Sequence, residues 1–136
     1  MNRIISAALC LLALCGAAEA EKVKITGGGE TFRAEIERTA LSAHLLESLP
    51  AEIEMRHLFP YQISGGRKIK AEGDFRRGLK KGDLAYCEYG YFIIFIENQP
   101  AGDRNGFVRI GRIEPDDVEK LGAVSGGGTI RIERAD

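Results

Sequence analysis

Tryptophan is absent from this chain of 136 residues, and only three cysteines are present, two of them in the first fifteen residues. The third, Cys87, is the only cysteine after residue 15, so no intramolecular disulfide can form within that part of the chain. A reactive thiol needs a basic and partly open setting. Cys87 lies instead in an apolar run and precedes Glu88, which favours an inert, buried side chain.

Neither sign of charge dominates the composition. Nineteen basic and twenty acidic residues leave a net charge of −1 at pH 7, so nothing draws the whole molecule toward nucleic acid or acidic membranes. No histidine, cysteine and carboxylate residues show the close spacing of a structural zinc site. We therefore expect no metal, no cofactor and no nucleic-acid partner.

The first twenty residues have the pattern of a cleaved signal peptide. Arg3 supplies a positive start, Ile4 to Leu14 is an apolar run, and Ala18-Glu19-Ala20 fits the small-x-small site of signal peptidase. We expect cleavage before Glu21. Residues 21–136 would then form a single periplasmic or secreted domain, long enough to bury a core.

Two alternatives for this segment are an uncleaved anchor and a lipoprotein. The apolar run is shorter than the roughly 20 residues that an ordinary membrane-spanning helix needs. Cys10 and Cys15 each follow a leucine, where a lipid-attachment site would have glycine or alanine. Both observations favour cleavage, and we do not expect an integral membrane protein.

Several short segments alternate apolar and other residues with a period of two, which is typical of strands with one face in a core. Tyr91 to Ile96 is apolar throughout, which predicts a central strand covered on both faces. Closely spaced strands joined by short turns indicate a small antiparallel barrel or sandwich. The alternating sets are Val23/Ile25, Phe32/Ala34/Ile36, Ala51/Ile53/Met55, Ile69/Ala71 and Ile130/Ile132.

Two runs of three glycines, at residues 27–29 and 126–128, stand next to predicted strands. A phosphate-binding loop would need a helix directly after it, with N–H groups facing the anion. Strands follow both runs, so we interpret them as turns, the first of them a hairpin turn.

Two short helices are predicted between the strands. Thr39 can cap the first, with Leu41, Leu45 and Leu46 toward the core and Pro50 closing the segment. In the second, Pro115 suits the first turn, Asp116 and Asp117 complement the helix dipole, and Gly122 ends the helix.

The order of these segments, with Gly82-Asp83-Leu84-Ala85-Tyr86 and Gly111-Arg112-Ile113, resembles the bacterial cyclophilin-like barrel family. That group contains small proteins of mostly unknown role. The resemblance covers the whole predicted domain and implies a mainly β fold. It implies a small closed antiparallel β-barrel of about eight strands with two short capping helices.

The resemblance does not carry an activity, because function belongs to sites rather than folds. Cyclophilins isomerise prolyl peptide bonds with an arginine near aromatic and glutamine residues, in a pocket lined by tryptophan and histidine. This chain has no tryptophan and lacks those motifs. Its Ile96-Glu97 also replaces an aromatic pair found in many members of the barrel family, which weakens any transfer of a ligand site.

A mixture of polar and aromatic residues follows the predicted strand at 51–55, where it gives way to a loop. His57 has the parity of Met55, which points it inward or at a barrel mouth. Phe59 and Tyr61 have the make-up of a ligand rim, and equally of a loop folded over the barrel end.

A basic stretch runs from residue 67 to residue 81, with seven basic residues against two acidic ones. It can attract an anionic envelope polymer, or be the solvated face of a hairpin. Arg104 lies in the loop of residues 102–106, which can be a lid or a long hairpin connection. Asn105-Gly106 favours a turn there.

We predict an exported, non-catalytic binding module for a small ligand or peptide at the barrel rim, with no catalytic residue. The predicted ligand-binding residues are His57, Phe59, Tyr61, Arg67 and Arg104. One alternative is an enzyme resembling a prolyl isomerase, of low or degenerate activity. Another is an envelope protein that binds anionic polymer through the basic stretch, and such binding should weaken steeply with salt.

Overall fold

The first hairpin shows how the alternating sequence forms this fold. In the structure, a computed structural model that describes residues 19–135, β1 (Ala20–Gly27) pairs with β2 (Glu30–Glu37). Val23 lies opposite Ala34 and Ile25 opposite Phe32, and all four side chains are buried. Gly28 and Gly29 have φ angles of 59° and 80°, which glycine adopts without strain in a two-residue hairpin turn.

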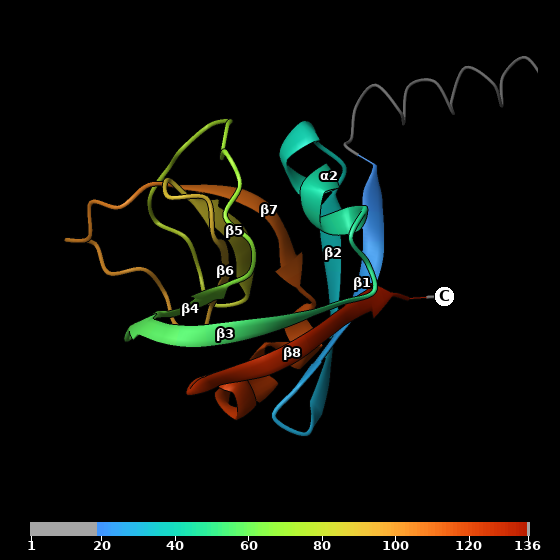
Figure 1. Ribbon diagram of the computed structural model, residues 1–136. Helices are drawn as coiled ribbons and strands as arrows, with labels where there is room; N and C mark the ends of the chain where they lie inside the picture. The colour runs from blue at the N-terminus through green and yellow to red at the C-terminus, as the bar shows by residue number, and fades with distance from the viewer. Residues whose placement is uncertain (1–18, 136) are drawn as a thin grey trace, which may run out of the picture.

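Eight antiparallel strands close into a barrel in the order β1-β2-β7-β5-β6-β4-β3-β8 (Figure 1). Closure leaves none of these strands with an unpaired edge. The predicted closed barrel of about eight strands is therefore confirmed. The other six strands are β3 (Ala51–Phe59), β4 (Gln62–Gly65), β5 (Asp83–Cys87), β6 (Phe92–Phe95), β7 (Phe107–Ile113) and β8 (Gly127–Arg134).

A short helix, α2 (Ala40–Leu46), covers one end of the barrel. Its start is a capping box: the Ser42 N–H donates to Thr39 Oγ1 at 3.1 Å, and the Thr39 N–H donates to Ser42 Oγ at 2.9 Å. Leu41, Leu45 and Leu46 are buried against the barrel, as the sequence predicted.

The second predicted helix is a 3-10 helix, η1 (Pro115–Val124), at the opposite end of the barrel in Figure 1. It continues beyond Gly122, so the predicted end was wrong. Asp117 is buried and accepts a hydrogen bond from the Arg33 backbone N–H at 2.7 Å, which ties η1 to β2. The backbone N–H group lowers the pKa of Asp117 and outweighs the opposing effect of burial.

The segment between β4 and β5, residues 66–82, does not form the hairpin that its charge pattern suggested. It has no regular secondary structure, and its one isolated β-bridge pairs Arg76 with Phe107 of β7. The predicted strand at Ile69 and Ala71 was therefore wrong. Their alternation has another cause, because both side chains pack partly buried against the barrel core without a partner strand.

Candidate functional site

Strands β5 and β6 bury apolar side chains on both faces, as predicted for the run to Ile96, but Tyr91 precedes β6 and is exposed. Phe92 and Ile94 point into the barrel core, whereas Ile93 and Phe95 point outward. The outward side chains belong to a second group, which we call the outer cluster. Its members are Tyr61, Leu79, Ala85, Ile93, Phe95 and Phe107.

Two irregular segments cover the outer cluster, residues 66–82 and residues 96–106. Figure 1 shows them on the side of the barrel away from β1 and β2. The second segment joins β6 to β7, and both of these strands pair with β5 rather than with each other. The loop of residues 102–106 is therefore not a hairpin connection, and the predicted hairpin there was wrong.

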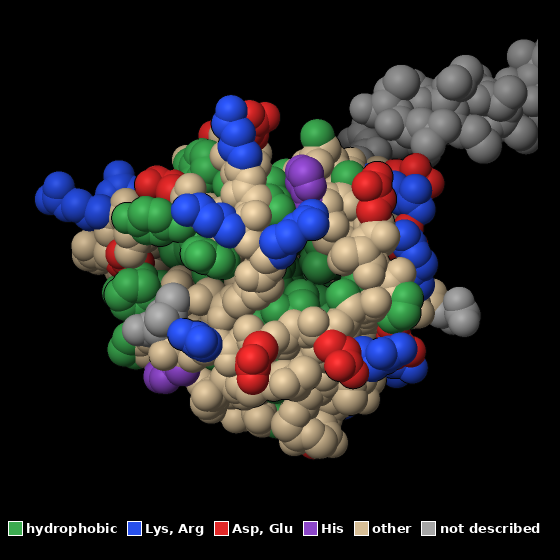
Figure 2. Space-filling model, viewed as in Figure 1, with side chains coloured by type: hydrophobic (Ala, Val, Ile, Leu, Met, Phe, Trp, Pro, Cys, Tyr) green, Lys and Arg blue, Asp and Glu red, His purple; other side chains and the backbone are tan. Residues whose placement is uncertain are grey.

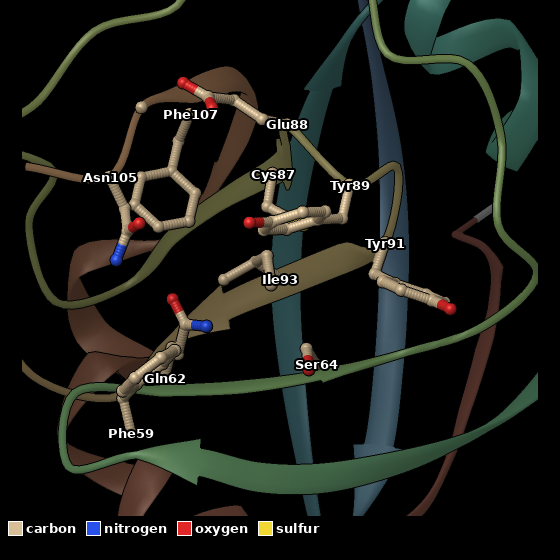
Figure 3. Close-up of a pocket in the computed structure, with 11 residues that line it drawn as sticks. Phe59, Gln62, Ser64, Cys87, Glu88, Tyr89, Tyr91, Ile93, Asn105 and Phe107 are labelled. Atoms are coloured by element: carbon tan, nitrogen blue, oxygen red, sulfur yellow. The ribbon is translucent and has the colours of Figure 1, made fainter.

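A cavity of about 340 Å³ opens beside the outer cluster, and we call it the outer cavity. It lies between the β3–β4 turn, the β5–β6 turn and the residues that precede β7 (Figure 3). Four of its lining side chains are aromatic. The lining residues are Phe59, Gln62, Ser64, Cys87, Glu88, Tyr89, Tyr91, Ile93, Asn105, Gly106 and Phe107.

Gln62 is the polar group buried most deeply in the wall of this cavity. Its side chain is 3 % exposed, and its Oε1 atom has no hydrogen-bond partner within residues 19–135. Figure 3 shows the amide directed from β4 across the cavity toward Ile93 and Asn105. A buried acceptor without a partner costs about 1–3 kcal/mol. The wall of the cavity therefore contains an unsatisfied hydrogen-bond acceptor.

An aromatic stack joins the cavity to the outer cluster. The ring centroids of Phe59 and Tyr61 are 5.7 Å apart, and those of Tyr61 and Phe95 are 5.9 Å apart, with nearly parallel planes in both pairs. Phe107 meets Phe95 edge to face at 4.9 Å. Phe59 is the exposed end of this stack, so it presents an aromatic surface that is already held in place.

Gln99 ties the two covering segments together. Its Oε1 accepts from the N–H groups of Gly78 at 2.8 Å and Leu79 at 3.2 Å, and its Nε2 donates to the Asn105 carbonyl at 2.9 Å. Gln99 is itself buried. The position of Asn105 on the cavity wall therefore depends on a side chain outside the cavity.

Asp103 and Tyr61 anchor the same loop to the aromatic stack. The Tyr61 hydroxyl donates to Asp103 Oδ2, and Asn105 donates to Asp103 Oδ1 from its side chain at 2.8 Å. Burial raises the pKa of Tyr61 to about 12, and the bond to the Asp103 carboxylate adds to the rise. Burial alone would raise the pKa of Asp103, but the hydrogen bonds from Tyr61, Asn105 and Gln99 outweigh it and lower that pKa.

The structure brings together only two of the five predicted ligand residues. Phe59 lines the outer cavity, and the ring of Tyr61 stacks against the ring of Phe59. Arg67 borders a different cavity, beneath α2, and Arg104 is exposed without lining the outer cavity. His57 is exposed and borders another cavity with Leu121 and Gly122 of η1, so it lies neither in the core nor at the outer cavity.

The sequence reasoning missed most of the cavity wall. Gln62 and Ser64 share one face of β4, and their spacing of two residues was the pattern that could have revealed them. Cys87 is half-buried and borders the cavity, so the expected burial of this thiol was wrong. Tyr89 was not predicted as a lining residue, because it lies in a turn, where side chains are usually exposed.

Within residues 19–135, no group of three or more histidine, cysteine or acidic residues is arranged to hold a metal ion. Among the same residues, no helix is long and apolar enough to cross a membrane.

A model of the Cyclophilin-like family matches residues 25–133. The chain belongs to the Cyclophilin-like family, and the predicted resemblance is confirmed. No curated protein matches the chain.

Two solved structures share the fold at low sequence identity. One is the structure of McbB in complex with tryptophan, with a TM-score of 0.65 and 14 % identity over 82 % of this chain and 44 % of that one. The other is the solution structure of the hypothetical protein AF2241 from Archaeoglobus fulgidus, with a TM-score of 0.63 and 16 % identity over 88 % of this chain and 98 % of that one. The chain spans less than half of the McbB chain, and both likenesses concern the fold alone.

Proposed function

We propose that this protein is a binding module that holds a small aromatic ligand, or the aromatic side chain of a peptide, in the outer cavity without converting it. The observation that carries the proposal is the buried amide of Gln62, whose oxygen has no partner within the described residues. A ligand that donates a hydrogen bond to this oxygen removes a cost that the unliganded protein bears.

The chemistry of the walls narrows the class of ligand. An amide presents an oxygen acceptor beside an NH₂ donor, which matches a peptide bond or an indole N–H group. Phe59, Tyr89 and Tyr91 line the outer cavity and can stack on a planar ring. A cavity of about 340 Å³ lies at the small end of the range for ligand pockets, which suits one ring system. McbB, which shares the fold, was solved in complex with tryptophan, and this is compatible with the proposed class.

The absence of tryptophan from the chain provides a direct test. N-acetyl-L-tryptophanamide carries an indole ring and two amides, and in a mixture with this protein only the ligand has indole fluorescence. We expect its emission to shift to shorter wavelength and to saturate on titration, because the ring leaves water. No change with N-acetyl-L-tryptophanamide or with free indole would exclude an aromatic ligand at this cavity.

Two variants locate the binding, and one controls for exposed aromatic surface. We expect Phe59→Ala to weaken binding roughly tenfold, since an aromatic pair contributes about 0.5–1.5 kcal/mol beyond its buried area. Gln62→Met should weaken it by a similar factor through the lost hydrogen bonds. Phe75 is 37 % exposed, against 44 % for Phe59, but does not line the cavity, so Phe75→Ala should leave the affinity unchanged.

Catalysis is tested in a separate assay with the same variants. We expect no acceleration of prolyl isomerisation in a short X-Pro peptide by the purified protein. Acceleration that Gln62→Met abolishes would make the outer cavity an active site and would overturn the non-catalytic proposal. Acceleration that only His57→Ala or Arg67→Ala abolishes would place the activity elsewhere on the barrel.

We also propose that the protein is exported to the periplasm or secreted. This rests on the pattern of residues 1–20, most of which lie outside the described residues. Mass spectrometry of the protein from its producing cells should give a chain that begins at Glu21. A chain that retains residues 1–20 in the cytoplasmic fraction would contradict export.

A further inference from the structure

A second cavity lies on the opposite face of β5 and β6, beneath α2, and we call it the inner cavity. It has a volume of about 310 Å³. Consecutive residues separate the two cavities: Tyr86 and Phe92 border the inner cavity, whereas Cys87 and Ile93 border the outer one. Figure 2 shows a hollow with hydrophobic side chains at its base on this face of the molecule, with a histidine and a basic side chain at its edge.

Tyr86 is the buried polar side chain of the inner cavity. It is 4 % exposed, and its ring meets Phe92 edge to face at 6.0 Å. Burial raises the pKa of Tyr86 to about 12, and the positive charge of Arg67 partly opposes that rise. Arg67 and Tyr86 both border the inner cavity.

Among residues 19–135, Arg67 makes no salt bridge. Within residues 67–81, the salt bridges of the structure are between Lys70 and Glu72 and between Lys81 and Glu97, and neither involves Arg67. His44, in the last turn of α2, stands on the same rim. Glu52 is the acidic residue of this rim, and its carboxylate lies 4.0 Å from the Arg131 guanidinium group.

The rest of the inner cavity is apolar. Leu45 and Ile53 are buried members of the barrel core, and Ile69 packs against that core. The position of Ile69 is held by its N–H, which donates to the Gly90 carbonyl at 3.0 Å. Gly90 has a φ of 90°, and a Cβ there would lie 1.8 Å from the Ile69 carbonyl oxygen, so only glycine allows this approach.

From this arrangement we infer that the inner cavity binds a small monocarboxylate with an apolar body. Arg67 would pair with the carboxylate, the Tyr86 hydroxyl would donate to one of its oxygens, and the apolar walls would enclose its hydrocarbon part. A single negative charge fits best, because Arg67 is the one permanently charged cation that borders this cavity. This inference does not depend on the function proposed for the outer cavity.

Benzoate and benzamide form a matched pair of probes, since they share a ring and differ in charge. We would titrate each into the isotope-labelled protein and follow the backbone amide signals of His44, Ile53 and Arg67 by NMR. We expect saturable shifts with benzoate, and binding of benzamide weaker by roughly a factor of ten or more, because hydrogen bonds to charged groups are the stronger ones. Equal affinity for the two probes, or no saturable shift with benzoate, would overturn the inference.

Variants separate a binding role from a structural one. Arg67→Gln should weaken benzoate binding roughly tenfold to a hundredfold, whereas Arg77→Gln, on the same exposed segment but outside the cavity, should not. Tyr86→Phe keeps the buried ring, so it should weaken benzoate binding about tenfold without lowering the melting temperature of the free protein. Equal effects of Arg67→Gln and Arg77→Gln would contradict the site. Phe59→Ala should leave benzoate binding intact, which distinguishes failure here from failure at the outer cavity.

Discussion

Ile93 and Ile94 are neighbours on β6, and each is 1 % exposed, yet they are buried by different parts of the molecule. Ile94 lies in the barrel core, which has 22 buried members and is enclosed by strands and by both helices. Ile93 lies in the outer cluster, which has six members and is enclosed by two irregular segments. Equal burial thus has two origins, and only one of them depends on loops held by a few hydrogen bonds.

The same contrast separates the two cavities. The inner cavity is bounded mostly by core side chains of a closed barrel and by a capped helix, and Gly66, Arg67 and Ile69 of its wall come from an irregular segment. The outer cavity depends on Gln99 and Asp103, which position the loop that carries Asn105. Ligand sites are commonly formed by loops on a rigid scaffold, and the outer cavity follows that pattern.

The largest expected difference between the two faces is in stability. Replacing a buried isoleucine by alanine costs about 2–5 kcal/mol, with the smaller values where the surroundings can collapse. We expect Ile94→Ala to lie near the upper end of this range and Ile93→Ala near the lower end, because the loops over Ile93 can move inward. Urea denaturation of both variants measures this. Equal losses would show that the two faces are equally rigid.

Gln99→Met should remove the tie between the covering segments while keeping the side-chain volume. We expect a loss of about 2 kcal/mol, since the N–H of Leu79 is left buried without a partner. Hydrogen exchange should accelerate at Gly78 and Leu79 and stay slow in β1 and β2. Asn98 accepts from the Lys81 N–H at 2.9 Å but is exposed, so Asn98→Ala is the matched control and should cost less. A similar loss in both variants would contradict the role given to Gln99.

The bond between Tyr61 and Asp103 should make stability depend on pH at both extremes. The pKa of Asp103 is lowered in the folded state, so its contribution is present above its ordinary pKa and is lost as the pH falls through the folded value. The pKa of Tyr61 is raised to about 12, so its contribution is present below pH 10 and is lost as the pH rises toward 12.

Tyr61→Phe tests this reading of the pair. We expect the variant to be less stable by about 1 kcal/mol at neutral pH, with shallower losses at both extremes. Free energies of unfolding measured across the pH range would show this. An unchanged pH profile would mean that the bond contributes nothing to holding the loop.

The smallest expected change has the opposite sign. Gln62→Met replaces an unpartnered amide by an apolar chain of similar length, so the unliganded protein should gain up to about 1 kcal/mol in stability. Thermal unfolding without ligand measures the gain. A clear loss of stability would mean that the amide has a partner in the free protein, and the main support for the outer cavity would be gone.

Much of the barrel was predictable because its strands follow simple rules. The alternation at residues 23–36 gives the first hairpin, and the apolar run of β6 indicates burial on both faces. Asp83 also explains part of the Gly-Asp-Leu motif. Its carboxylate accepts from the Lys80 N–H at 2.8 Å and stabilises the turn that begins β5.

The cavities were harder to predict, because they depend on what covers the strands. Nothing in the run from Tyr91 to Ile96 shows that one of its faces meets loops and the other a closed core. Ile69 alternates like a strand residue although its segment pairs with none. A register shift between His57 and Phe59 separates two residues that looked like one rim. Gln62 was passed over because its importance lies in a missing partner, which only the fold reveals.

Methyl NMR with isotope-labelled isoleucine gives the most direct test of the outer cavity as a ligand site. Ile93 and Ile94 are adjacent in sequence, but only Ile93 lines the outer cavity. On titration with N-acetyl-L-tryptophanamide, we expect the δ1 methyl signal of Ile93 to move saturably through the ring current of the indole, while that of Ile94 stays in place. Movement of Ile94 alone, or of neither methyl group, would contradict it.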